Sequence, residues 1–332
     1  MTHQTRMTRR ASIAGLAATA AAVGHRRAGS AEPIQLKLAT ADTMADTTYD
    51  VGQRFGAEVA RRTNGKYQLP MFVGGALGTT LNLASSLQTG IIDCAILTSG
   101  YTASVVPSVQ VVDLPFAFKD ETTAERLLDG ALGQRLFADM EARGIKGLVW
   151  GWQGWRQMEI RDRPVRTPDD MRGLKMRIQP SPMFVALFKA LGAIPVPLDG
   201  GEVYLGLSQG TVGGVDFPLP TAVTFKVYEV TKYLVLTRHV YNAGVLMVSQ
   251  NRWNQLTPDD RAAFQQAAEV VRPFWRTTIA ERSDQALSFL QAHGMQSINV
   301  DFAAFQEKMK PLYDQFSPQY PDLFKLLMEA RT

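Results

Sequence analysis

Ile34–Gln35–Leu36–Lys37–Leu38–Ala39 begins the stretch, residues 34–97, that decides the fold. Its alternating apolar and polar residues predict a β-strand, and apolar residues at helical spacing from Thr47 to Arg62 predict a helix after it. A second strand, a second helix and a third strand are expected at residues 66–73, 79–88 and 91–97. This order predicts an α/β fold with a parallel sheet and helices on both faces.

The second half of the chain repeats the alternation, and a length of 332 residues suits two lobes. We expect strands at residues 145–153, 174–178, 194–196, 212–217, 233–239 and 245–249, and helices at residues 121–142, 182–191 and 202–209. Thr257–Pro258–Asp259–Asp260 has the residues of a helix start, and this helix is expected to reach about His293. It should be kinked at Pro273 and lie across both lobes.

Residues 1–31 have the pattern of an export signal. They hold five arginines and no acid, and the pair Arg9–Arg10 precedes a weakly apolar run from Ile13 to Val23. This pattern predicts export to the periplasm by the Tat route, with a disordered basic tail as the alternative. No later stretch offers about 18 uninterrupted apolar residues, so we expect a mature protein that does not span the membrane.

Without these 31 residues the net charge of +4 becomes −1, which gives no argument for nucleic acid or an anionic membrane as partner. Cys94 lies in an apolar run and is expected to be a small buried hydrophobe. His239 and His293 are too few for a zinc or iron site, and no glycine-rich stretch has the spacing of a dinucleotide fingerprint. We therefore expect no metal, no cofactor and no enzymatic activity.

Arg156 and Arg177 stand in apolar, strand-like surroundings. Arg156 has only Glu159 close to it in sequence, which an extended strand would turn to the opposite face, and Arg177 has no acid nearby. A guanidinium offers a planar fork of donors that matches a carboxylate, so two of them facing one cleft would hold a small organic anion. In the alternative interpretation Arg177 is a surface residue and Arg156 belongs to a packing cluster around the tryptophans at positions 150, 152 and 155.

Several runs carry a family pattern: Gly154–Trp155–Arg156–Gln157, then Arg163–Pro164–Val165–Arg166–Thr167–Pro168–Asp169–Asp170–Met171–Arg172–Gly173–Leu174–Lys175–Met176–Arg177, and upstream Asp113–Leu114–Pro115–Phe116–Ala117–Phe118. With Glu202–Val203–Tyr204 and Leu207–Ser208–Gln209–Gly210 further on, the chain closely resembles the extracytoplasmic solute-binding proteins of TRAP transporters, the DctP family. The likeness covers nearly the whole mature chain in order.

The resemblance implies a periplasmic-binding-protein-like fold of two lobes that are joined by strands and crossed by a long helix. It implies capture of a small organic acid between the lobes, hinge-like closure, and docking on the membrane subunits of a TRAP permease. Most members are monomers, and we expect a monomer here. We expect lobe I at residues 32–153 with part of 240–275, and lobe II at residues 154–239 with part of 276–332.

In the family, the arginine at the position of Arg177 contacts the ligand carboxylate, and the arginine at Arg156 is a second frequent anion contact. The family's usual Gln-Glu-Asn-Pro run is replaced by Val215–Asp216–Phe217–Pro218, and Gly200 stands where an aromatic residue is common in sialic-acid-type members. We therefore expect a carboxylate with an apolar or aromatic body, against Trp155, Phe217 and Trp152. The expected ligand-binding residues are Arg177, Arg156, Phe217, Trp155, Asp216, Thr98 and Ser99.

Thr98 and Ser99 belong to this set because they end the third strand, where parallel sheets often place ligand contacts, although an ordinary loop start is an equal alternative. Two other functions remain open at this point. The chain could serve an ABC importer or a sensor for an organic acid, which share the two-lobed design, or it could be an enzyme that has kept the lobes. Neighbouring genes for TRAP permease subunits would favour a TRAP solute-binding protein over both of these alternatives.

Overall fold

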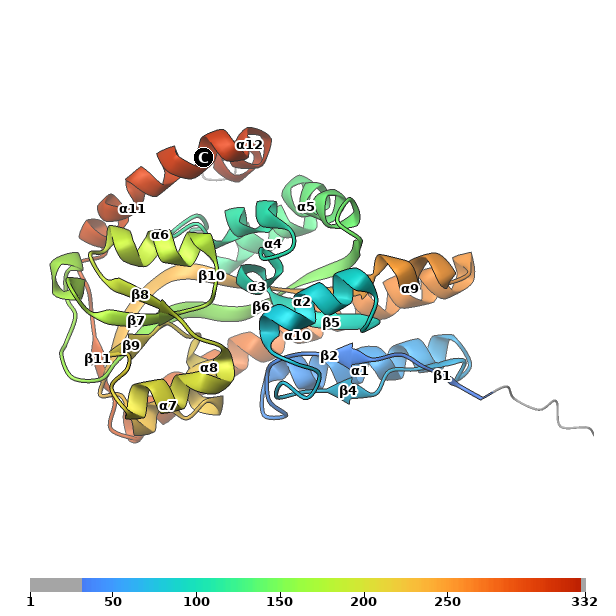
Figure 1. Ribbon diagram of the computed structural model, residues 1–332, viewed down its shortest axis with the longest axis horizontal. Helices are drawn as coiled ribbons and strands as arrows, with labels where there is room; N and C mark the ends of the chain where they lie inside the picture. Colours follow the sequence, from blue (N-terminus) through green and yellow to red (C-terminus); the bar gives the residue numbers. More distant parts are fainter. Residues whose placement is uncertain (1–31, 330–332) are drawn as a thin grey trace, which may run out of the picture. The chain divides into compact units, whose positions relative to one another are not determined.

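The computed structural model describes residues 32–329, and the export signal predicted for residues 1–31 lies outside them. Its main element is a nine-stranded mixed sheet in the order β4-β2-β5-β10-β6-β9-β7-β8, with β11 paired to β10 (Figure 1). The strands are β1 (Ile34–Gln35), β2 (Leu38–Ala39), β3 (Tyr67–Gln68), β4 (Met71–Phe72), β5 (Cys94–Thr98), β6 (Ile145–Ile160), β7 (Lys175–Ile178), β8 (Ile194–Pro197), β9 (Gly214–Val215), β10 (Tyr233–Ser249) and β11 (Gln296–Ile298).

The sheet consists of two parallel parts joined by two long antiparallel strands. β2 pairs in parallel with β4 and β5, and β7 pairs in parallel with β8 and β9. Between them β6 and β10, of 16 and 17 residues, pair with each other in antiparallel register and continue through both parts. The predicted parallel sheet is therefore correct for each part and wrong for the sheet as a whole.

Twelve α-helices of the described residues accompany the sheet. They are α1 (Thr47–Arg62), α2 (Thr80–Thr89), α3 (Ser99–Thr102), α4 (Glu121–Asp129), α5 (Ala131–Glu141), α6 (Pro182–Ala190), α7 (Val203–Ser208), α8 (Leu219–Thr224), α9 (Gln250–Gln255), α10 (Pro258–Ala292), α11 (Phe302–Phe316) and α12 (Pro321–Glu329). α1 has the predicted bounds, and the residues that form its apolar stripe, Val51, Phe55 and Val59, are fully buried.

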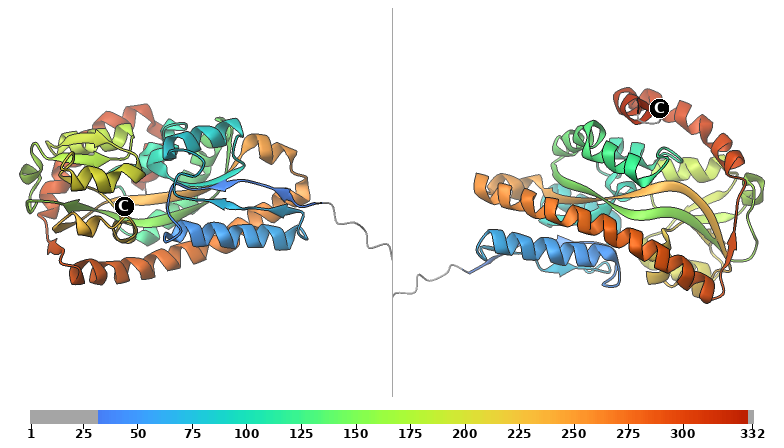
Figure 2. Two further views of the ribbon diagram at one scale, coloured as in Figure 1. Left: turned by 60° about the horizontal axis from the view of Figure 1, so that its bottom comes forward. Right: turned by 180° about the vertical axis from the view of Figure 1, so that it is seen from behind.

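The predicted long helix is α10, which runs through 35 residues without a break at Pro273. The Thr257 side chain accepts a hydrogen bond from the Asp260 backbone N–H at its start, as the sequence pattern indicated. A helix of this length extends about 52 Å, close to the span of β6. α10 packs on α1, β6 and α8 and therefore contacts both parts of the sheet (Figure 2).

Two predicted element boundaries are wrong for identifiable reasons. The helix expected at residues 121–142 is two helices, because Gly130 has ψ −147°, outside the helical range. The two strands expected at residues 233–239 and 245–249 are one strand, β10. The residues between them, 240–244, are buried throughout, so they lack the alternation by which a half-exposed strand is recognised.

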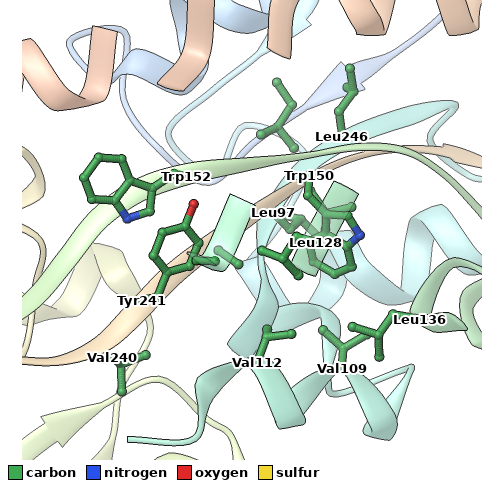
Figure 3. Close-up of a cluster of buried hydrophobic side chains, with 14 of the residues drawn as sticks. Leu97, Val109, Val112, Leu128, Leu136, Trp150, Trp152, Val240, Tyr241 and Leu246 are labelled. Atoms are coloured by element: carbon green, nitrogen blue, oxygen red, sulfur yellow. The ribbon is translucent and has the colours of Figure 1, made fainter. Parts of the chain in front are cut away.

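Residues 33–329 pack as one compact unit, so the predicted lobe boundaries near residues 153 and 239 remain a proposal. Cys94 is fully buried, as expected, and burial raises the pKa of its thiol. Trp150 and Tyr241 are among the largest fully buried side chains, and they lie in the cluster drawn in Figure 3. Within residues 32–329, no helix combines the length and the apolar character that crossing a bilayer requires.

Candidate functional site

Arg156 and Arg177 line one small cavity of about 40 Å³. Side chains from both parts of the sheet contribute to its wall. They include Thr98 and Tyr101 on one side, Gln179 and Phe217 on the other, and Gln153 and Asn242 from the long strands. The sequence placed the two arginines 21 residues apart on separate strands, and only the register of β6, β9 and β7 brings them to the same place.

The Arg177 side chain is fully buried and keeps one donor free. Its Nε and Nη2 atoms donate to the Leu198 carbonyl at 3.0 and 2.8 Å, and Nη2 also donates to the Tyr101 hydroxyl at 2.9 Å. Nη1 has no hydrogen-bond partner among the described residues, and no carboxylate forms a salt bridge with this guanidinium there. A buried positive charge with an unused donor is suited to an anionic ligand.

Arg156 is also fully buried, but the protein itself neutralises it. Nε donates to the Asp216 carboxylate at 2.6 Å, Nη2 donates to the Asp216 backbone carbonyl, and Nη1 donates to Asn242 Oδ1 at 3.0 Å. Burial alone would raise the pKa of Asp216, but the Arg156 guanidinium and a hydrogen bond with His239 hold that pKa below its usual value. The two arginines are therefore unequal, and only Arg177 has charge to offer a ligand.

Asp216 does not line the cavity, and its carboxylate pairs with the Arg156 guanidinium. It was expected as a ligand contact, and the structure instead shows it fully buried as the ion-pair partner of Arg156. Sequence reasoning missed this pair because the two residues are 60 positions apart. Glu159, the acid that is near in sequence, accepts a hydrogen bond from the Phe217 backbone N–H instead.

Trp155 and Trp152 were expected to line the apolar side of the ligand, but neither lines the cavity at Arg177. Both line a different cavity, together with Leu236 and Leu287. Trp152 stacks on Tyr241 with ring centroids 5.6 Å apart. The two side chains are neighbours in Figure 3, and the Trp155 indole N–H donates to Glu121.

The reason is a β-bulge in β6 near Gly154. Tyr241 pairs with Trp155 while Ala243 pairs with Trp152, so β6 carries an extra residue between them. Gly154 has φ +104°, a conformation that side chains other than glycine rarely adopt. The bulge turns both tryptophans to one face and places Gln153 and Arg156 on the face that lines the cavity.

Phe217 forms an aromatic wall of the cavity, together with Phe225. Their ring centroids lie 5.3 Å apart, and the Phe217 ring lies 5.3 Å from the Arg177 guanidinium carbon. A Cβ atom added to Gly200 would lie 3.4 Å from the Phe225 ring, so Phe225 occupies the space beside this glycine. The residue that fills this space was not predicted from the sequence.

Thr98 lines the cavity and its hydroxyl lies 3.4 Å from Gln179 Oε1. Ser99 does not line it, because its hydroxyl donates to Asp113 at 2.5 Å. Burial raises the pKa of Asp113 to about 7 despite that hydrogen bond. Of the two residues predicted at the end of the third strand, only Thr98 is therefore placed to contact a ligand.

Four of the lining residues that sequence reasoning missed fall into two groups. Asp42 follows β2 and Gln179 follows β7, so the rule that ligands bind at the carboxyl ends of parallel strands would have found both. Gln153 and Asn242 lie inside long antiparallel strands, where no sequence signal marks them. No group of three or more potential metal ligands is found among residues 32–329.

A sequence profile of the bacterial extracellular solute-binding proteins, family 7, matches residues 39–319 of this chain. The 2,3-diketo-L-gulonate-binding periplasmic protein YiaO of Escherichia coli is 30% identical over 324 residues, which cover 96% of this chain and 97% of that protein.

Two solved structures of TRAP periplasmic solute-binding proteins are similar throughout. The Sulfitobacter protein, with bound β-D-galacturonate, gives a TM-score of 0.86 at 27% identity and covers 89% of this chain and 98% of its own. A Bordetella protein, with density assigned to pantoate, gives a TM-score of 0.85 at 32% identity and covers 90% of this chain and 98% of its own.

Proposed function

Because this chain belongs to the bacterial extracellular solute-binding proteins of family 7, we propose that it captures a small organic carboxylate between two lobes and delivers it to a TRAP permease. The family and its relatives are binding proteins of transport systems, not enzymes. The observation that carries the choice of ligand is Arg177, a fully buried guanidinium whose Nη1 has no partner among the described residues.

The hydrogen bonds around the cavity support ligand capture by closure. Arg177 contacts Tyr101, Gln179 lies beside Thr98, and the Asp199 carboxylate accepts the Thr80 backbone N–H at 3.1 Å. With lobes divided near residue 153, each of these contacts joins one lobe to the other. A ligand carboxylate on Arg177 would add a further link between lobes and favour the closed form.

The ligand body is proposed to be apolar or aromatic. Phe217 and Phe225 support this, because an apolar ligand group buried against them would gain roughly 1.5–3 kcal/mol relative to water. A ligand hydroxyl left unpaired against Phe217 would cost about 1–3 kcal/mol. Pantoate, assigned in the Bordetella relative, has a branched apolar centre, whereas galacturonate in the Sulfitobacter relative has hydroxyls along its ring.

Export by the Tat route through residues 1–31, a periplasmic location and a monomeric state belong to the same proposal. The periplasmic relative from Escherichia coli supports the location. No observation favours the alternative in which the protein serves an ABC importer or a sensor.

The test is calorimetry against a library of organic acids, with Arg177→Lys and Arg177→Gln beside the parent protein. Lysine keeps the charge but loses the planar fork, so we expect about 30-fold weaker binding, which is a loss of about 2 kcal/mol. Glutamine removes the charge and should abolish binding. Arg135→Lys, on an exposed residue paired with Asp139, is the matched control and should bind normally.

Each of two outcomes would contradict a different part of the proposal. Unchanged affinity in Arg177→Gln would show that Arg177 does not anchor the ligand. Glucuronate bound more tightly than every branched 2-oxo acid would contradict the apolar body and leave carboxylate binding intact.

A further inference from the structure

A second and larger cavity, of about 280 Å³, adjoins the cavity at Arg177. The two share Asp42, Gln153 and Thr221 in their walls. The second cavity is also lined by Asp46, Arg282 and apolar residues of α8 and α10. A ligand held by its carboxylate at Arg177 can therefore extend past Asp42 and Gln153 into this space.

The charges at the two ends of this combined site differ in sign. Arg156 is balanced by Asp216, which leaves Arg177 as the positive end. At the other end stand the carboxyl groups of Asp42 and Asp46. Arg282 is close to them, but its own donors go to Asp50 at 2.5 Å and to the Thr47 hydroxyl at 2.9 Å.

Hydrogen-bonding groups at the shared wall remain free for a ligand. Gln153 is 7% exposed, and its Nε2 donor has no partner among the described residues. The hydroxyls of Thr40 and Thr48 both donate to Asp42 Oδ2, at 3.3 and 2.7 Å, so Oδ1 of this carboxyl remains available. A ligand hydroxyl can donate to Asp42 and accept from Gln153 at the same time.

Resting on the solute-binding function above, we propose that Asp42 and Gln153 form a second ligand subsite, which takes the uncharged, hydroxyl-bearing far end of a monocarboxylic acid and excludes a second carboxylate. The apolar wall of Phe217 and Phe225 then lies along the middle of the ligand. A second carboxylate could accept from Gln153, but it would face the carboxyl groups of Asp42 and Asp46 at the same wall, and like charges repel at short range.

The test compares matched pairs of acids that differ only at the far end: 4-hydroxybutyrate with succinate, 5-hydroxypentanoate with glutarate, and 6-hydroxyhexanoate with adipate. Calorimetry at pH 8 is suitable, because loss of hydration and the neighbouring Asp46 raise the pKa of Asp42 to about 7. We expect the hydroxy acid to bind at least about tenfold more tightly than the diacid in the pair whose length fits.

The variant Asp42→Asn keeps the shape and removes the charge, so the preference for the hydroxy acid should fall at least about fivefold. Asp139→Asn, on a partly exposed carboxylate outside both cavities, is the control and should leave the preference unchanged. A diacid that binds as tightly as its hydroxy acid, or a preference that Asp42→Asn leaves intact, would overturn the exclusion and leave the solute-binding function standing. Absence of binding by any acid, in these pairs and in the wider library, would overturn both.

Discussion

The Asp216→Asn variant should be less stable than the parent protein. It should not gain a second site that binds anions. The Arg156 Nε and Asp216 Oδ2 atoms are 2.6 Å apart, and both side chains are 0% exposed. Removing one partner of a buried ion pair usually costs about 3–5 kcal/mol, because the remaining charge stays buried without compensation.

The lower end of that range is expected, because several partners of Arg156 remain. An asparagine oxygen, the backbone carbonyl of residue 216 and Asn242 can still accept from the guanidinium. A loss of about 3 kcal/mol corresponds to a melting temperature lower by roughly 5 °C for a protein with about 300 folded residues. Asp139→Asn, in an exposed pair with Arg135, should change stability by less than about 1 kcal/mol.

Urea unfolding followed by tryptophan fluorescence is a suitable assay, and its pH dependence gives an independent check. The pKa of Asp216 is lower in the folded protein than its usual value, so its contribution is present above about pH 4 and is lost as the pH falls through the folded pKa. The difference between parent and variant should therefore hold from pH 5 to 8 and shrink below pH 4. Unchanged stability of Asp216→Asn would refute the assignment of Arg156 as a residue neutralised by Asp216. Tighter binding of acids by this variant would refute the separate expectation that no second anion site is gained.

Two further predictions concern Gly154 and the buried acids. Gly154→Ala should lower the free energy of unfolding by at least about 1 kcal/mol in urea titrations, because φ is +104° and the new Cβ would lie 2.9 Å from Pro218 Cβ; equal stability would argue against the bulge. The pKa values of Asp42 and Asp113 are raised to about 7, so the folded protein holds more protons than the unfolded chain between about pH 4 and 7 and loses stability as pH rises. Asp42→Asn should flatten that decline, and an identical pH profile would contradict it.

The short-range signals in the sequence predicted much of the fold correctly. The bounds of α1, the start of α10 and its approximate end follow from helical spacing, capping residues and a proline at the first helical position. These features act within a few residues, so they can be read directly. The same signals failed for β10, whose middle residues are buried on both faces and show no alternation.

The candidate site was also predictable from the sequence only in part. Arg177 could be identified from its surroundings and from the family pattern, because a lone charge in an apolar strand requires a partner. The sequence could not reveal that Nη1 of Arg177 is free, that a cavity lies beside it, or that Phe225 lies beside Gly200. These features depend on residues from distant strands and helices.

The sequence by itself therefore determined the alternating elements and the long helix, and it identified Arg177 as a candidate for binding a carboxylate. Only the tertiary structure decided that Arg156 is neutralised by Asp216 and that the tryptophans face away from the cavity. Pairing across 60 residues and one extra residue in β6 cause these two outcomes. Strand register and bulges are set by packing and hydrogen bonds between distant segments, so local sequence patterns do not specify which face a side chain reaches.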